Sequence, residues 1–405
     1  MRERRFFRGW SVLIALALIY AVCNGIMGNC VGVIFAAIIK DRGFAASQLS
    51  LYYSVKSIVS ALAVGSMVKF FFSSRRPNII FAVLGVVMSV SFGIMALFQN
   101  VWQWYISAVL GGIASCTIGV ILPVIINNWF QVNQGTLIGV TFMGSGLVSA
   151  VFSPIASKII ENFGWRTACL VLMGIGIVGW VIPALVLVVV SPETVGLHPL
   201  GYDGPGAMKE KETAGSGRVP AESIFVLSIL ALLLPGGLTS LNNQLATFAT
   251  SSGYTLAVGA TITSCAMMGN LLSKLAIGVI SDRMGGMSAV RIFMVLIALG
   301  IALILTGISS GNPLFLYAGA FCFGSTFAVS VTSPSLVYKD IYGIEEYRGR
   351  LSRYQKYSML FGTVSSFLFP FIYDKTGTWS PVFVYGFFAS IAGVILVSYI
   401  RKKVR

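Results

Sequence analysis

Three lysines lie inside long apolar segments of this 405-residue chain: Lys56, Lys274 and Lys356. A charged side chain at bilayer depth costs on the order of 3 kcal/mol, so one that is kept there is a candidate for function. All 13 acidic residues map to loops or to the ends of apolar segments. Opposite charges about 4 Å apart attract by roughly 4 kcal/mol at an effective dielectric constant of 20. The charge pattern therefore favours an anionic substrate.

Each lysine also has a structural interpretation. Lys274 lies eight residues, about 12 Å of helix, before Asp282, so its stem could reach toward the membrane surface or pair with an acid at the helix end. Lys56 lies near the middle of its segment, where such a reach is hardest. Lys356 closely follows two arginines, which is also typical of an anchor at the membrane interface. We expect substrate binding at Lys274 first, with Lys56 and Lys356 as further candidates.

Amides at bilayer depth form a second group of candidates. The stretch "LNNQL" places Asn242, Asn243 and Gln244 next to one another in one apolar segment, and three adjacent amides should not all face lipid. Asn127 is a further amide near the end of another apolar segment. Asn243, Gln244 and Asn127 therefore join the lysines as candidate substrate-binding residues.

The sequence gives no sign of enzymatic or ATP-driven chemistry. It contains no phosphate-binding Gly-x-x-x-x-Gly-Lys-Ser/Thr loop and no nucleophile motif. Its only histidine, His198, lies in a polar stretch, and its six cysteines show no metal-ligand spacing. We expect no enzyme activity, no cofactor and no metal site, so that any transport must draw on gradients.

The composition places these residues in a membrane. Hydrophobic residues make up 56% of the chain and charged residues only 10%, whereas soluble domains are about 25% charged. The net charge of +15 comes from basic residues at the ends of apolar segments, so we expect a lipid bilayer rather than nucleic acid as the partner. Backbone polar groups in lipid must be paired within the fold, so we expect an all-α membrane protein.

Apolar runs between polar breaks predict twelve transmembrane helices in two six-helix halves. The halves are residues 1–190 and 222–405, with a cytoplasmic central loop at 191–221. The first run is too long for a cleaved signal core of roughly 7 to 15 residues, so it is interpreted as a span. The predicted spans are 10–39, 47–72, 77–98, 101–128, 135–160, 165–190, 222–250, 255–281, 289–309, 312–340, 350–373 and 379–400.

Basic residues orient the predicted helices. With both termini cytoplasmic, the inside segments hold 20 of the 28 Lys and Arg residues and the outside loops hold five, as the positive-inside rule requires. We therefore expect a multi-pass protein of the cell membrane with both termini in the cytoplasm. The oligomeric state stays open, with a monomer favoured.

The two halves resemble each other. "LAVGSMVK" (62–69) lies at the position of "LAIGVISD" (275–282), and Pro154 before "FGWR" corresponds to Pro370 before "TGTW". These matches indicate a duplication. Parallel six-helix halves are typical of transporters whose halves move about a site near the midplane.

The stretch "GVISDRMGG" resembles the loop 8/9 signature Gly-x-x-x-Asp-Arg-x-Gly of the major facilitator superfamily, here Gly278, Asp282 and Arg283. Within that family, "NNWFQVNQGTLIGVTFMGSG", "FGWR", "SPETVGLHPLG" and "YDKTGTWSPVF" resemble the oxalate/formate antiporter and monocarboxylate transporter branch over essentially the whole chain. The resemblance implies a major facilitator fold and a small carboxylate substrate. It also implies a basic substrate-binding residue one turn before the signature glycine, which is Lys274, and a gating role for the signature.

Two departures from the family pattern stand in the N-terminal half. The equivalent loop 2/3 reads "GSMVKFFFSSRRP", with Lys69 where the family has an acid, and Gln134 stands where the branch usually has a basic residue. These departures concern the charge contact of that half and leave the expected fold unchanged.

The sequence therefore predicts a secondary carrier of a small mono- or dicarboxylate that works by alternating access, with exchange favoured. Proton symport of a monocarboxylate is the second hypothesis. A drug exporter would ordinarily carry an acid within the membrane, and a transporter-derived sensor would lose gating signatures. Both classes stay open as alternatives.

Overall fold

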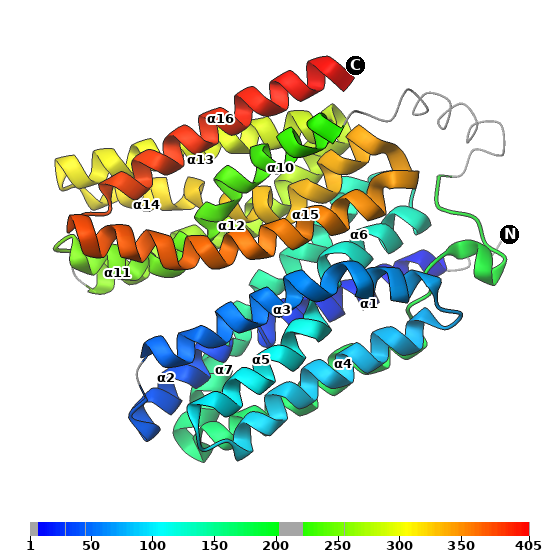
Figure 1. The fold of residues 1–405 in the computed structure, drawn as a ribbon, viewed down its shortest axis with the longest axis horizontal. Coiled ribbons are helices and arrows are strands. Elements are labelled where there is room, and N and C mark those ends of the chain that lie inside the picture. Colours follow the sequence, from blue (N-terminus) through cyan, green and yellow to red (C-terminus); the bar gives the residue numbers. More distant parts are fainter. Residues whose placement is uncertain (1–6, 29, 45, 202–221, 255, 405) are drawn as a thin grey trace, which may run out of the picture. The chain divides into compact units, whose positions relative to one another are not determined.

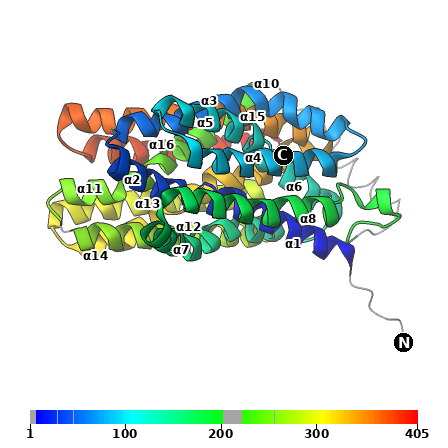
Figure 2. The same cartoon turned by 90° about the horizontal axis from the view of Figure 1, so that it is seen from below.

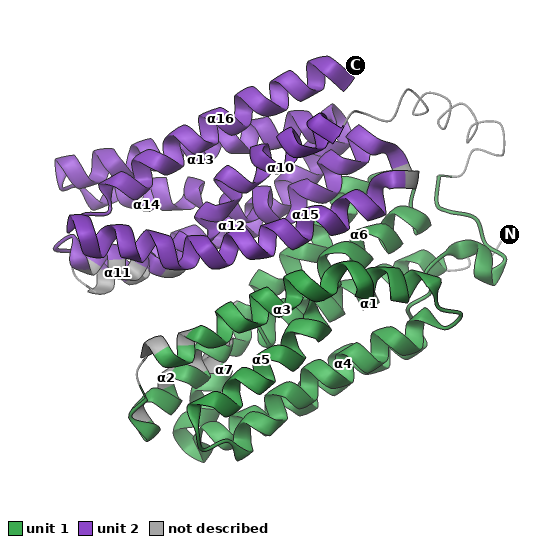
Figure 3. Ribbon diagram, in the orientation of Figure 1, with its two compact units in different colours: residues 1–202 green, residues 203–405 purple. Residues whose placement is uncertain are grey.

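The computed structural model describes residues 7–28, 30–44, 46–201, 222–254 and 256–404 (Figure 1). The chain divides into two compact units, residues 1–202 and 203–405 (Figure 3). The described residues are largely helical and contain no named β-strand, which confirms the predicted all-α fold. The N-terminal tail before residue 7 and residues 202–221 of the predicted central loop lie outside the described residues.

Unit 1 contains helices that follow the first six predicted spans. The helix α7 runs through two of these spans and is divided at Gly164, whose φ of 80° is outside the helical region. The predicted span 10–39 is likewise divided, since its first part ends in a π-helix at Ile26. The elements of unit 1 are α1 (Arg8–Tyr20), η1 (Ala21–Ile26), α2 (Cys30–Arg42), α3 (Ala46–Ser73), α4 (Pro77–Gly93), η2 (Ile94–Leu97), α5 (Val101–Ser115), α6 (Ile118–Trp129), α7 (Gln134–Gly176), η3 (Ile177–Val181), α8 (Ile182–Val186) and η4 (Pro192–Val195).

Unit 2 follows the other six predicted spans. Its longest helix, α15, is divided at Gly343, where a φ of 65° lets the chain turn back (orange in Figure 1). The eleventh helix therefore begins directly after Gly343 and not at residue 350 as predicted. The elements of unit 2 are α10 (Glu222–Gly236), η5 (Gly237–Gln244), α11 (Leu245–Ser251), α12 (Leu256–Met284), α13 (Gly286–Ser310), α14 (Pro313–Phe323), η6 (Ala328–Thr332), α15 (Ser333–Thr376) and α16 (Ser380–Val404).

Ten helical stretches of the described residues are long and apolar enough to cross a bilayer. Two of the twelve predicted spans are not separate members of this set. The predicted span 135–160 is partly joined to its successor in the stretch Ile155–Val186. The predicted span 350–373 is absent from the ten; it contains Arg350, Arg353 and Lys356 besides several Gly, Ser and Thr residues.

Each unit has its own apolar core. Within each unit the long helices run roughly alongside one another (Figures 1 and 2). Trp104, Trp129 and Trp180 are fully buried in unit 1, as are Tyr338 and Tyr354 in unit 2. Large apolar side chains also cover much of the exposed helix surface, as a hydrocarbon environment requires.

Candidate functional site

Lys274 is buried inside unit 2. It lies ten residues, about 15 Å of helix, before the end of α12, and only 4% of its surface is exposed. Its ammonium lies 5.5 Å from the centre of the Phe327 ring, within the range of a cation–π interaction. The side chain of Lys274 thus packs against a neighbouring segment of its own unit.

The segment that carries Phe327 is an interrupted helix. Between α14 and α15 the chain makes a turn at Gly324 and then forms the π-helix η6. A Cβ at Gly324 would collide with the carbonyl oxygen of Ala266 on α12, and one at Gly269 on α12 would collide with that of Phe321. Glycine on both sides therefore lets the two backbones touch. Interrupted helices beside a binding site are typical of secondary transporters, and π-helical turns occur frequently at functional sites.

Buried amides lie in the same unit. Asn242, in the 3-10 helix η5, donates from Nδ2 to the Thr326 hydroxyl at 2.9 Å. Asn270 lies one helical turn before Lys274 on α12. The Oδ1 atoms of Asn242 and Asn270 are buried and accept no hydrogen bond from the described residues. Such oxygens need a donor from water or a ligand.

The predicted amides of the "LNNQL" stretch differ in what the structure describes. Gln244 is half-buried, while the side chain of Asn243 lies outside the described part of the chain. Their binding role stays a prediction. Sequence reasoning passed over Asn270, although its i−4 spacing from Lys274 was a usable signal, and Phe327, for which no signal existed.

The predicted residues of unit 1 have different surroundings. Lys56 is half-buried on α3, and its charge acts on the buried Cys23 thiol in the π-helix η1. Asn127 is buried on α6, and neither polar atom of its side chain has a hydrogen-bond partner among the described residues. The backbone carbonyl oxygen of Asn127 accepts a 3.3 Å hydrogen bond from Gln134 Nε2.

Lys356 is exposed on the second part of α15. It lies 13 residues, about 20 Å of helix, beyond Gly343, so it is farther from the start of its helix than a start at residue 350 implied. The described contacts do not join Lys356 to Lys274. That the three lysines hold one substrate stays a prediction.

The signature residues end α12. Gly278 is buried, while Asp282 and Arg283 are exposed in the last turn. The following turn, with Gly285 at a φ of 83°, leads into α13.

The start of α13 is held by a carboxylate from α15. Asp340 Oδ2 accepts a hydrogen bond from the Met287 amide at 3.2 Å. A carboxylate at a helix N-terminus is stabilised by the unpaired amides and by the helix dipole. Asp340, which the sequence placed only at a helix end, therefore fixes the loop 8/9 turn.

A cluster of ion pairs lies nearby in sequence on α15. Arg350 bonds to Glu222 at 2.5 Å and to Glu346 at 3.2 Å, and Arg353 lies 3.3 Å from Glu222. The Arg350 guanidinium also lies 5.0 Å from the centre of the Phe225 ring. These contacts join the starts of two helices in unit 2.

The corresponding end of unit 1 is held by aromatic side chains and backbone acceptors. Trp129 is fully buried, packs edge-on against Phe7 at 5.9 Å and donates from Nε1 to the Val189 carbonyl at 2.6 Å. Gln134 Nε2 donates to the Phe130 carbonyl. A parallel β-bridge joins Phe130 to Leu200, with hydrogen bonds of 2.9 Å on both sides.

Residues 17–354 match the sequence profile of the Major Facilitator Superfamily. Since this match covers most of the chain and the fold consists of helices that follow the twelve predicted spans, the chain belongs to that superfamily of membrane transporters. It is a multi-pass integral membrane protein and not an enzyme.

The proteins similar to the chain include a solved symporter and a yeast transporter. The solved structure of the superfamily's proton:xylose symporter XylE, bound to 6-bromo-6-deoxy-D-glucose, superposes with a TM-score of 0.74. It covers 98% of this chain and 96% of that one, at 14% identity, and shows the fold alone. The uncharacterized transporter ESBP6 of Saccharomyces cerevisiae (strain ATCC 204508 / S288c) is 23% identical over 205 residues, which are 49% of this chain and 30% of the yeast protein. The match thus spans about a third of that relative.

Proposed function

We propose that this secondary transporter carries a small organic anion, a mono- or dicarboxylate, and that exchange is its favoured mode. Alternating access follows from membership of the superfamily. The substrate class rests on charge and on the placement of one buried cation.

The observation that carries the proposal is the burial of Lys274 beside an interrupted helix. A charge kept at this depth is costly and is therefore a candidate for function. The Phe327 ring offers it a weak electrostatic partner. A carboxylate would offer a stronger one, because a full negative charge about 4 Å away attracts by roughly 4 kcal/mol at an effective dielectric constant of 20.

Charge compensation also favours exchange. The anion neutralises the lysine in the loaded carrier, which lowers the cost of closing the site around it. In the empty carrier the same closure would enclose Lys274 without an anion beside it. A carrier of this kind therefore reorients across the membrane more readily with an anion bound than when empty.

Uptake into proteoliposomes tests the substrate class. Labelled oxalate, formate, lactate and pyruvate are offered with and without unlabelled anion inside, and with and without a pH gradient, with xylose as a neutral control. We expect uptake of at least one anion, accelerated by anion inside. Acceleration by an inward proton gradient alone would favour symport. Uptake of xylose or of a cationic drug instead of any anion would refute the proposed substrate, and no uptake at all would favour a sensor.

Lys375 supplies a matched control for Lys274. Both ammonium groups lie over a phenylalanine ring, at 5.8 Å for Lys375 and 5.5 Å for Lys274, but Lys375 is exposed at the end of α15. We expect Lys274→Gln to abolish most anion uptake and Lys375→Gln to leave it unchanged. Equal uptake by the two variants would contradict a binding role for Lys274.

A further inference from the structure

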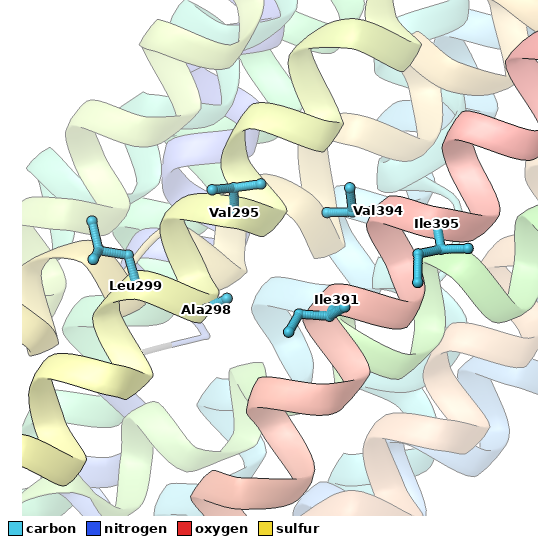
Figure 4. Close-up of a pocket in the computed structure, with 6 residues that line it drawn as sticks. All are labelled: Val295, Ala298, Leu299, Ile391, Val394 and Ile395. Atoms are coloured by element: carbon cyan, nitrogen blue, oxygen red, sulfur yellow. The ribbon is translucent and has the colours of Figure 1, made fainter.

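An apolar groove runs between α13 and α16 of unit 2 (Figure 4). Its volume is about 300 Å³. The exposed side chains at its rim, such as Val295 at 55% and Ile395 at 63%, show that the groove opens on the outside of the helix pair. It is lined by Val295, Ala298, Leu299, Ile391, Val394 and Ile395.

The groove follows the axes of both helices. Its residues recur at the spacing of one helix face, with Val295 and Leu299 on α13 and Ile391 and Ile395 on α16. The apolar lining spans about one helical turn on each helix, which suits contact with part of a hydrocarbon chain.

A basic side chain closes one end of the groove. Arg291 lies one turn before Val295 on α13 and donates from Nη1 to the Ser398 hydroxyl, one turn beyond Val394 on α16, at 3.3 Å. Arg291 is five residues, about 8 Å, from the start of α13, which places it near a membrane surface. Its Nε is buried and donates to none of the described residues. The guanidinium thus retains a donor at the head of the groove.

Further positive charge lies beyond Arg291. The last turn of α16 carries Arg401, Lys402 and Lys403. The charge of Arg401 acts on Asp340, and Lys403 lies 5.3 Å from the Tyr399 ring, while Lys402 is exposed. One end of the apolar groove is therefore positively charged.

We propose that this groove binds an anionic glycerophospholipid, with its phosphate at Arg291 and Lys402 and one acyl chain along the groove. Basic side chains above an apolar cleft between transmembrane helices have the chemistry that recognises an anionic headgroup with its tail. The proposal is independent of the substrate, because it concerns a face formed by α13 and α16 alone.

Native mass spectrometry of the purified full-length protein tests the site. Phosphatidylglycerol and phosphatidylcholine with identical acyl chains are compared, with glycerol 3-phosphate as a probe that lacks the chains. We expect phosphatidylglycerol to be retained at least about fivefold over phosphatidylcholine, since each basic residue near the surface contributes about that factor. Glycerol 3-phosphate should not displace it.

Variants separate the headgroup from the tail. Arg291→Gln should remove the preference for phosphatidylglycerol, and Arg291→Lys should restore most of it. Val394→Trp, which fills the groove, should weaken retention of both lipids. Arg75→Gln, a loss of one exposed charge in unit 1, should behave as the parent.

Three outcomes would overturn the site. These are equal retention of both lipids by the parent, an equal loss of preference in Arg75→Gln and Arg291→Gln, and displacement of the lipid by glycerol 3-phosphate. If Arg291→Gln does not fold, Lys402→Gln and Val394→Trp carry the test, and unchanged retention in both would be equally decisive.

Discussion

Helix ends in unit 1 and in unit 2 are held by different kinds of contact. In unit 2 the start of α13 is capped by Asp340, and ion pairs of Arg350 tie neighbouring helices together. In unit 1 the residue before α4, Arg76, forms no side-chain hydrogen bond with the start of that helix. The described helix ends of this unit are held instead by Trp129 and by the Gln134 side-chain amide, which both donate to backbone carbonyls. The described starts of α4 and α13 are therefore held by different kinds of contact.

The lysines show the same contrast. Lys274 in unit 2 is buried against a ring in an interrupted helix, whereas Lys56 in unit 1 is half-buried beside a π-helix. Ionic contacts weaken as salt rises and ring packing does not. The Arg350 ion pairs of unit 2 should therefore weaken more with salt than the Trp129 contacts of unit 1.

The largest effect is expected from removing the buried lysine. Lys274→Gln should lower initial anion uptake by at least about 100-fold, because roughly 4 kcal/mol of attraction is lost and each 1.4 kcal/mol is a factor of ten. Lys56→Gln should cost less than about tenfold, since Lys56 is only half-buried whereas Lys274 is buried. Equal losses in the two variants, measured in proteoliposomes, would remove the contrast between the units.

The aromatic contact of unit 1 should have the next largest effect. Trp129→Ala empties a fully buried site and should destabilise unit 1 by about 3–5 kcal/mol. Hydrogen exchange should then rise in α1 and α6. Trp102→Ala, at a site 58% exposed, is the control. Faster exchange confined to unit 2 would contradict the assignment.

The helix cap of unit 2 should have a smaller effect. Asp340→Ala removes a charged acceptor from the start of α13 and should cost about 1–2 kcal/mol of local stability. Hydrogen exchange at Met287 should accelerate. Asp340→Asn keeps a neutral acceptor, so its exchange rate at Met287 should fall between those of Asp340→Ala and the parent. Unchanged exchange at Met287 in both would show that the cap does not hold the turn.

The smallest effect is expected at the ion pairs of Arg350. Arg350→Gln should lower the melting temperature slightly at about 0.1 M salt, and the difference should vanish near 1 M, where the Debye length is roughly 3 Å. The same salt change should leave the melting difference between Trp129→Phe and the parent unaltered. A salt-independent effect of Arg350→Gln would indicate that packing on Phe225, and not charge, is what the arginine contributes.

The apolar pattern predicted the helical segments because hydrocarbon demands long apolar helices. It placed the start of the eleventh helix too late. The charged residues before position 350 were assigned to a loop, yet Glu and Arg are good helix formers, and Glu346 and Arg350 stabilise each other at i,i+4. Charge in a sequence therefore marks a membrane surface better than it marks a helix end.

Parts of the candidate site could not be predicted. The depth of Lys274 in its helix followed from its distance to Asp282, but its contact with Phe327 spans 53 residues and depends on the turn at Gly324. A window of about 20 apolar residues does not register a π-helical turn inside it. The cap by Asp340 is likewise a contact between distant helices, which a single sequence does not reveal.

The β-bridge between Phe130 and Leu200 fixes part of the predicted central loop to unit 1. Leu200 lies ten residues inside the stretch predicted as central loop, and its backbone is bonded to Trp129 and Gln131. The chain up to that residue must travel with unit 1 whenever the carrier alternates. A cross-link that ties Leu200 to Phe130 would join parts that already move together, so we expect it to leave the transport cycle unrestrained.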